Sequence, residues 1–181
     1  MNRLEQHYRE KVVPKMREAF GYTNDHAVPR LVKVVVNVGI GRGLKDEKFQ
    51  SVVHSTLERI TGQKPVVNKA KKSISSFKIR KGMPVGMSVT LRGKRMYDFT
   101  EKLVNVTLPR VRDFQGLDTK VLDGQGNVNL GFKEHIVFPE IRPDEVESIH
   151  GLEVAIVTTA RDNESALKLF TLLGFPFKKS E

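Results

Sequence analysis

The stretch Lys64–Arg95, KPVVNKAKKSISSFKIRKGMPVGMSVTLRGKR, organises this chain. It holds ten lysines and arginines and no carboxylate. Its formal charge equals the net charge of the whole chain, +10, because the residues on either side of it cancel one another. An unneutralised block of this kind repels itself in an isolated fold. We therefore expect a polyanionic partner, nucleic acid before an anionic membrane surface.

The ends of this stretch are predicted to be strands and its middle a loop. Pro65–Val67 is a short strand candidate, and Val85–Arg92 alternates apolar with small or polar residues, which is typical of a half-exposed strand. Residues 68–82 between them are rich in lysine and serine and are followed by Pro84, which argues against a helix. We expect a long exposed loop or ribbon tip, and loops of this length are usually functional or disordered.

An amphipathic helix is predicted at the N-terminus. From Asn2 to Phe20 the apolar residues recur every four positions, and Gly21 stands where a C-cap belongs. Pro14 is expected to kink this helix or to divide it into two, because its ring clashes with the carbonyl four residues back.

A strand, a glycine-rich turn and a helix follow. The strand Leu31–Val38 carries Lys33 and Asn37 on its polar face, and a helix is predicted from Asp46 to about Ile60. The turn at 39–43 reads Gly-x-Gly-x-Gly, not Gly-x-Gly-x-x-Gly, and no Gly-Lys-Ser/Thr follows. It therefore favours a tight turn over a nucleotide site, while its amides could still contact an RNA backbone.

The remaining elements alternate between helix and strand. We expect a helix at Lys94–Leu108, a hairpin of 121–122 with 128–132, a candidate strand end at 136–139, an acidic helical turn at 143–148, a strand at Leu152–Thr159 and a helix from Asp162 or Asn163 to Leu173.

Composition limits the chemistry. At 181 residues, 39% of them hydrophobic, the chain is predicted to be a single domain, 1–181, with the basic loop 68–82 as an appendage. There is no cysteine, the five histidines are scattered, and no nucleophile motif occurs, so we expect no catalytic residue, metal site or cofactor. No signal peptide and no membrane-spanning run is recognisable, which predicts a soluble cytoplasmic protein.

The basic stretch suits RNA. Its lysines and arginines can neutralise phosphates and its serines can donate hydrogen bonds to phosphate or ribose. Phe77 could stack on an unpaired base or could anchor the loop to the core, and the sequence leaves both open. The acidic cluster of Asp144, Glu145 and Glu147 likewise fits either a solvated surface or contacts with a basic partner protein.

Six motifs in chain order resemble a known family. They are GQKPVVNKAKKSISSFKIRKGMPVG (62–86), VTLRG (89–93), LPRVRDF (108–114), FPEI (138–141), VTTA (157–160) and LLGFPF (172–177). Motifs of this length in this order are a specific signal, and they span essentially the whole chain. The chain resembles the bacterial-type fifth protein of the large ribosomal subunit.

The resemblance implies an α+β fold, an antiparallel β-sheet packed against helices with a long basic loop between two strands, and no enzymatic activity. The family binds 5S rRNA and helps attach it to 23S rRNA in the central protuberance. It reaches the P-site tRNA through the basic loop and touches a small-subunit head protein at an intersubunit bridge. Neighbouring large-subunit proteins are further expected partners, whereas a membrane or a small-molecule substrate is not.

The family's roles are carried over by position. The predicted 5S rRNA-binding residues are Lys33, Asn37, Gln63, Lys64, Thr90 and Arg92. The predicted contacts to tRNA and nearby 23S rRNA are Lys69, Lys71, Lys72, Ser73, Lys78, Arg80 and Lys81. At 122–128 this chain has LDGQGNV where the family usually has FDGRGNY, so the turn is expected to survive without the family's arginine and tyrosine.

Two alternatives stand beside the ribosomal function. A free-standing RNA-binding or RNA-chaperone module could use the same basic patch. A nucleotide-dependent enzyme would have to be built on Gly39–Gly43.

Overall fold

The computed structural model describes residues 2–44 and 46–178. Its tertiary contacts divide the chain into two compact units, which we describe separately. Unit 1 comprises Met1–Val34, Leu91–Leu130 and Ala155–Glu181, and unit 2 comprises Val35–Thr90 and Gly131–Val154. The single domain expected over residues 1–181 stays a prediction.

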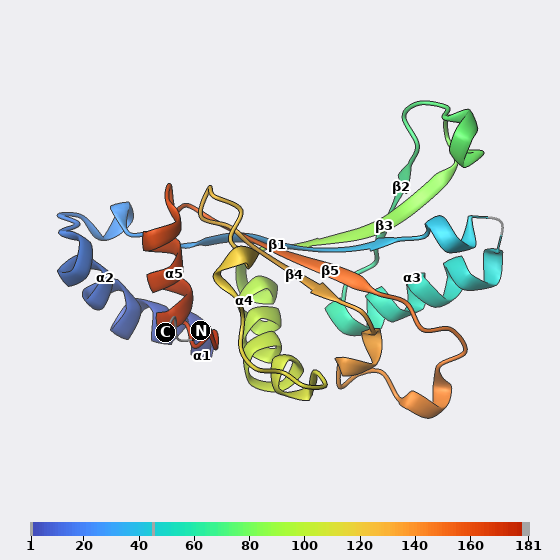
Figure 1. Ribbon diagram of the computed structural model, residues 1–181. Coiled ribbons are helices and arrows are strands. Elements are labelled where there is room, and N and C mark those ends of the chain that lie inside the picture. The colour runs from blue at the N-terminus through green and yellow to red at the C-terminus, as the bar shows by residue number, and fades with distance from the viewer. Residues whose placement is uncertain (1, 45, 179–181) are drawn as a thin grey trace. The chain divides into compact units, whose positions relative to one another are not determined.

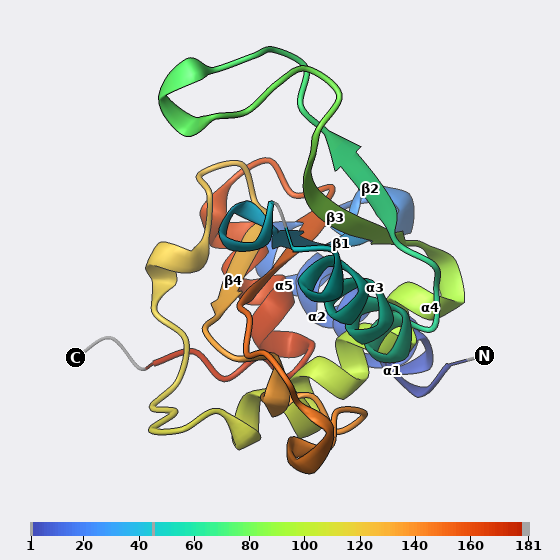
Figure 2. The ribbon, with the colours of Figure 1, turned by 90° about the vertical axis from the view of Figure 1, so that its right-hand side faces the viewer.

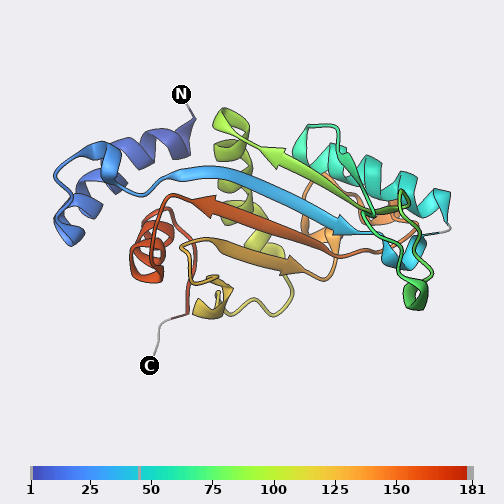
Figure 3. The same ribbon diagram turned by 90° about the horizontal axis from the view of Figure 1, so that it is seen from above.

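Five strands form one sheet (Figure 1). They are β1 (Leu31–Gly39), β2 (Val66–Lys69), β3 (Pro84–Leu91), β4 (Val128–Phe132) and β5 (Leu152–Thr158). The order is β2-β3-β1-β5-β4, and Figure 3 shows β3, β1, β5 and β4 running alternately in opposite directions. The predicted α+β class with an antiparallel sheet is confirmed.

The strands alternate between a buried and an accessible face. In β1, Val34, Val36 and Val38 are buried, whereas Lys33 and Asn37 remain partly accessible. Successive side chains of a strand point to opposite faces, so one row enters the core and the other stays free. The predicted polar face of this strand is confirmed.

In unit 2, helix α3 (Glu47–Thr61) follows the glycine-rich turn. The Asp46 carboxylate accepts hydrogen bonds from the backbone N–H of Lys48 (3.0 Å) and Phe49 (3.2 Å), which satisfies two donors at the helix start. Gly62 ends the helix in the left-handed conformation, at φ +65°. Both predicted ends are confirmed.

The turn before α3 needs glycine for packing. Gly41–Gly43 forms a 3₁₀ turn, and a Cβ on Gly43 would lie 2.1 Å from a ring carbon of Phe49. No side chain fits there without displacing that ring. This close approach accounts for Gly43 without a phosphate ligand, in agreement with a tight turn.

In unit 1, two helices each contain one π turn. Helix α1 (Arg3–His7) passes through a π turn at Tyr8–Val12 into α2 (Val13–Phe20). Helix α4 (Gly93–Lys102) passes through a π turn at Leu103–Thr107 into a 3₁₀ turn, Leu108–Arg110.

Each π turn ends two residues before a proline. The N–H of Val13, before Pro14, bonds to the carbonyl of Tyr8, and the N–H of Leu108, before Pro109, bonds to that of Leu103. Proline lacks an N–H and its ring crowds the carbonyl four residues back. A wider turn accommodates that clash, so the predicted division at Pro14 occurs without a break in the helical path.

Helix α5 (Asn163–Leu172) completes unit 1. The Asp162 side chain caps it by accepting from the N–H of Ser165 at 2.8 Å, as predicted.

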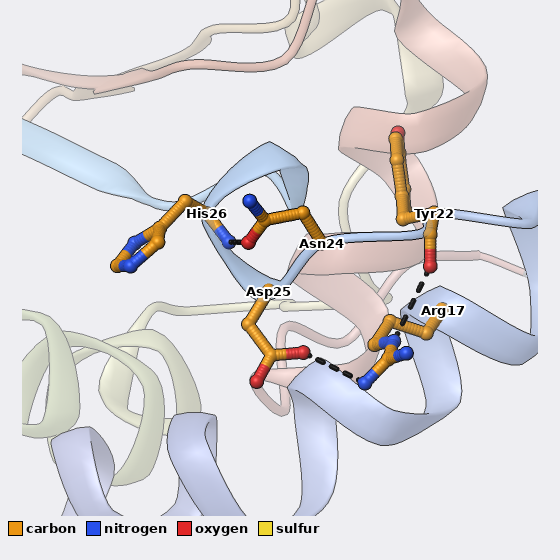
Figure 4. A network of polar contacts seen from close by, with 5 residues as sticks. All are labelled: Arg17, Tyr22, Asn24, Asp25 and His26. Carbon is orange, nitrogen blue, oxygen red and sulfur yellow. Dashed lines mark hydrogen bonds and ion pairs between the residues drawn. The ribbon is translucent and has the colours of Figure 1, made fainter.

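At the C-terminal end of α2, Arg17 donates to the carbonyl of Tyr22 (3.2 Å) and to Asp25 Oδ1 (2.9 Å), as Figure 4 shows. These bonds tie the 3₁₀ turn Asp25–Ala27 to the helix.

Two predicted strand segments are wrong. Residues 121–122 do not form a strand, because Thr119–Val121 is a 3₁₀ turn and only Leu122 bridges to Val128. Residues 136–139 do not either, because His135–Val137 is a 3₁₀ turn. In both places a 3₁₀ turn forms despite the β-propensity of the apolar residues.

The acidic region contains the 3₁₀ turn Pro143–Glu145, close to the predicted helical turn. None of the helices in the described part of the chain is long and apolar enough to cross a membrane.

Candidate nucleic-acid interface

Residues 68–82, which we call the finger, form a closed ribbon that extends from β2 and β3 of unit 2 (Figures 1 and 2). At its base, the N–H of Ala70 donates to the carbonyl of Met83 (2.8 Å), and that of Gly82 to the carbonyl of Ala70 (2.9 Å). Near the tip, Ile74 and Ile79 exchange two backbone hydrogen bonds of 2.9 and 3.1 Å. Of the two predicted forms, the ribbon tip is confirmed.

The tip is a tight reversal. Ser75–Phe77 forms a 3₁₀ turn, and Lys78 follows in the left-handed conformation at φ +55°. The N–H of Lys81 donates to the Ser73 hydroxyl at 3.0 Å, which joins the two sides. The finger therefore has an internal hydrogen-bond pattern of its own.

The finger's charge is not neutralised. Within residues 2–44 and 46–178, no carboxylate forms an ion pair with a finger cation. All six cations are exposed: Lys69, Lys71, Lys72, Lys78, Arg80 and Lys81. A polyanion that approaches the ribbon meets these cations without displacing an existing partner.

Phe77 does not anchor the finger to the core. Its side chain is 69% exposed, and neighbouring Ile74 is 45% exposed. The structure therefore removes the anchoring alternative for Phe77. Ile79 is partly buried and belongs to the ribbon's own pairing with Ile74.

A polar surface lies on the accessible face of β1, β2 and β3 in unit 2. Asn68 pairs with Gly86 across the β2–β3 ladder, and its Nδ2 donates to the Ser88 hydroxyl at 3.1 Å. A Cβ on Gly86 would lie 3.1 Å from the carbonyl oxygen of Val38 and 4.0 Å from Asn37 Oδ1. Gly86 itself is buried between these two amide side chains, whereas Asn37, Asn68 and Ser88 are partly accessible.

The four predicted 5S rRNA-binding residues of unit 2 lie around this surface. Asn37 and Thr90 are on the same accessible rows of β1 and β3. Gln63 donates through Nε2 to the carbonyl of Thr90 at 3.3 Å, which places it, with exposed Lys64 beside it, at the end of β3.

The other two predicted residues, Lys33 and Arg92, belong to unit 1. Lys33 lies on β1, two positions from Val35 on the accessible row, and Arg92 is exposed at the start of α4. Because side chains alternate along a strand, Ser88 faces the same way as Thr90 and could have been included among the predicted RNA-binding residues. Its hydrogen bond to Asn68 could not be predicted, because that bond depends on the β2–β3 register.

An acidic segment, residues 140–149, lies elsewhere in unit 2. Arg59 of α3 holds it through Glu145 Oε2 (3.0 Å) and through the carbonyl of Glu140 (2.8 Å). Asp144 and Glu147 are exposed and form no ion pair in the described part of the chain, and Ile149 is 57% exposed.

Two histidines that flank this segment in the sequence stack on each other. The rings of His135 and His150 are 4.1 Å apart and nearly parallel, at 6°, and both are buried. Burial lowers the pKa of His150 to about 4, with a further lowering from His135, and burial also lowers the pKa of His135. No pattern in the sequence predicted that these two histidines would stack, since they are far apart along the chain.

The altered turn at 122–128 keeps its fold. The Asp123 carboxylate accepts from the N–H of Gln125 (2.8 Å) and of Asn127 (3.0 Å). Asn127 Oδ1 in turn accepts from the N–H of Thr158 at 3.0 Å. Val128, which replaces the family's tyrosine, is fully buried, while Gln125 is exposed.

Two family profiles together match most of the chain. The profile described as ribosomal protein L5 matches residues 24–80, and the profile for the C-terminus of the same ribosomal family matches residues 84–177. The chain belongs to the ribosomal L5 family. The predicted family and the absence of enzymatic activity are thereby confirmed.

Relatives that align with nearly the whole chain support the same family assignment. The proteins from Halothermothrix orenii and Desulfatibacillum aliphaticivorans are 54% and 53% identical over 179 residues, which is 99% of this chain and 100% of each relative. The protein from Thermotoga maritima is 51% identical over 176 residues, 97% of this chain and 96% of the relative. Each is named large ribosomal subunit protein uL5. A member of this family is a structural constituent of the large subunit and is located in the ribosome.

Proposed function

We propose that this protein binds 5S rRNA and helps attach it to 23S rRNA in the central protuberance. The polar surface formed by Asn37, Asn68 and Ser88, which are partly accessible, supports this proposal because short polar side chains on a sheet can meet phosphate and ribose groups of a folded RNA. Gln63, Lys64 and Thr90 extend the same surface. Lys33 and Arg92 are proposed to contribute from unit 1.

The finger is proposed to contact the P-site tRNA and nearby 23S rRNA. The observation that carries this proposal is the finger's unpaired charge on a ribbon with its own hydrogen bonds. Because backbone hydrogen bonds already hold the ribbon together, less conformational entropy is lost when a polyanion binds than for an open loop. A ligand that arrives and leaves repeatedly suits a projecting element.

The acidic segment is proposed to meet a basic small-subunit head protein at an intersubunit bridge. Exposed Asp144 and Glu147 lie on a segment held by Arg59 through Glu145, and they present negative charge that no cation of the described residues pairs with. Neighbouring large-subunit proteins are the other proposed protein contacts.

A salt titration of two RNAs tests the division between surface and finger. Replacing Lys71, Lys72 and Lys81 by alanine is expected to weaken tRNA binding more than 5S rRNA binding, because these side chains lie on the finger. For wild type and 5S rRNA, about five neutralised phosphates give a log–log salt slope of roughly −3.5 to −4.5. Filter binding or anisotropy from low to moderate salt measures both quantities.

The control variant removes the same number of positive charges from a part of the chain outside the finger. Replacing the exposed Lys11, Lys15 and Lys168 of unit 1 by alanine is expected to leave both affinities close to wild type. Equal loss of tRNA and 5S rRNA binding in the finger variant would contradict the division. A wild-type slope near zero would contradict the electrostatic account altogether.

A further inference from the structure

The finger carries an apolar feature that its charge does not explain. Phe77 lies in the 3₁₀ turn at the tip and is 69% exposed. Ile74 near the same tip is 45% exposed, so the end of the ribbon presents two apolar side chains whose burial against another molecule would be favourable. The ribbon closes through the backbone of Ile74 and Ile79, which means that the Phe77 side chain is not needed to hold it.

The surroundings of this ring identify the kind of partner. Lys78 follows it directly, and Lys72, Arg80 and Lys81 belong to the same unneutralised finger. A basic protein is repelled by these charges. Nucleic acid offers both things that the tip can bind, phosphates for the cations and flat base faces for the ring.

We propose that Phe77 stacks on an unpaired nucleobase of the RNA that the finger contacts. This inference rests on the proposed function of the finger and adds the chemical element that it recognises. The lysines and arginines would supply attraction that depends on salt, and the ring would supply a contact that requires an accessible base. A regular duplex offers no such base along its length, so the tip would favour loops and other unpaired positions.

Three replacements of Phe77 separate stacking from charge. Phe77→Leu keeps an apolar side chain but removes the aromatic face, and we expect it to weaken binding of a tRNA transcript about 5- to 150-fold, the effect of one base stack. The log–log salt slope should not change, since no cation is lost. Phe77→Tyr and Phe77→Trp each keep an aromatic face, and both should bind tRNA about as tightly as wild type does. Binding to polyphosphate, a polyanion without bases, should be the same for all four proteins.

The chain has no tryptophan, so Phe77→Trp also introduces a single fluorescent reporter. We expect tRNA to quench this emission and polyphosphate to leave it unchanged. Ile149→Trp is the matched control, because Ile149 is similarly exposed, 57%, but lies on the acidic segment. Its emission should not respond to tRNA. Thermal unfolding of each variant should resemble wild type, since both side chains are exposed.

Several results would overturn the inference. If Phe77→Leu binds tRNA as tightly as wild type while the finger lysine variant does not, the stacking proposal fails and the finger's function stands. If neither variant loses affinity, both proposals fail. If Phe77→Tyr and Phe77→Trp bind tRNA as weakly as Phe77→Leu does, an aromatic contact is excluded. A blue shift of the Phe77→Trp emission on phosphatidylglycerol vesicles, without quenching by tRNA, would identify a lipid surface instead.

Discussion

At the scale of single residues, Gly126 shows how closely the turn at 122–128 fits against the rest of unit 1. Gly126 has φ +82°, and a Cβ there would lie 2.7 Å from Ala160 Cβ and 2.9 Å from the Ala160 carbonyl oxygen. The Thr158 hydroxyl donates to the Gly126 carbonyl at 2.7 Å, which holds the turn in that position. Gly124 has a similar φ, +86°, but nothing lies within 4 Å of its would-be Cβ.

These two glycines give a matched pair of substitutions. Gly124→Ala is expected to cost about 1–2 kcal/mol, the strain of a left-handed alanine. Gly126→Ala adds a clash with backbone atoms and should cost roughly 2–4 kcal/mol. Urea unfolding measures both, and equal losses would show that contact with Ala160 is not tight.

At the scale of elements, the connection between β4 and β5, residues 133–151, is held at its base by the stacked histidines. The N–H of His135 donates to the carbonyl of His150 at 3.1 Å, and the N–H of His150 donates to His135 Nδ1 at 3.3 Å. His150 Nε2 is buried and has no hydrogen-bond partner in the described part of the chain. A proton on this ring would therefore place an unpaired charge in the interior.

Stability is expected to fall in acid because of this pair. The unfolded chain protonates His150 near its ordinary pKa of 6.5, whereas the folded chain does so only near 4, so between these values the unfolded state binds more protons. The stabilisation is complete above pH 6.5 and is lost progressively toward pH 4, by roughly 3 kcal/mol for this residue. Urea unfolding at a series of pH values measures the slope.

His150→Phe provides the comparison, since it keeps a stacked ring and removes the titrating group. Its stability should depend less on pH between 6.5 and 4 than that of wild type. The same slope in both proteins would mean that other groups cause the acid sensitivity.

At the scale of the whole molecule, charge of opposite sign is placed on separate segments. Residues 64–95 carry the net positive charge of the chain, while exposed Asp144 and Glu147 lie on the acidic segment. This separation would let the proposed RNA and basic-protein partners bind without either neutralising the other's site.

Reversing the acidic charge tests the proposed bridge in cells. Asp144→Lys with Glu147→Lys should still enter large-subunit particles, because the proposed RNA-binding residues are unchanged, but should shift sucrose-gradient profiles from joined ribosomes toward separate subunits. Glu10→Lys with Glu18→Lys, on exposed positions of unit 1, is the control and should leave the profile unchanged. An unchanged profile for the first variant would contradict the bridge, and a tagged wild-type chain found only in small complexes would favour a free-standing RNA-binding module.

Local signals in the sequence were sufficient to predict most of the helices and strands. The alternation of valines in β1, the Asp46 and Asp162 caps and the glycines that end α2 and α3 act within a few residues of their own position, so each could be predicted without knowing the fold. The concentration of charge in Lys64–Arg95 depends only on composition. These features determined most of the elements and predicted an anionic partner, whereas the antiparallel α+β class was predicted from the resemblance of the six motifs to the ribosomal family.

Contacts between distant segments decided the rest. The sequence could not say whether Phe77 would be buried or exposed, because that depends on whether the ribbon folds back on the core. The His135–His150 stack and the Asn68–Ser88 bond join residues whose pairing no periodicity encodes. The apolar stretches at 121–122 and 136–139 lie in or beside 3₁₀ turns, and no local pattern in the sequence distinguishes such turns from short strands.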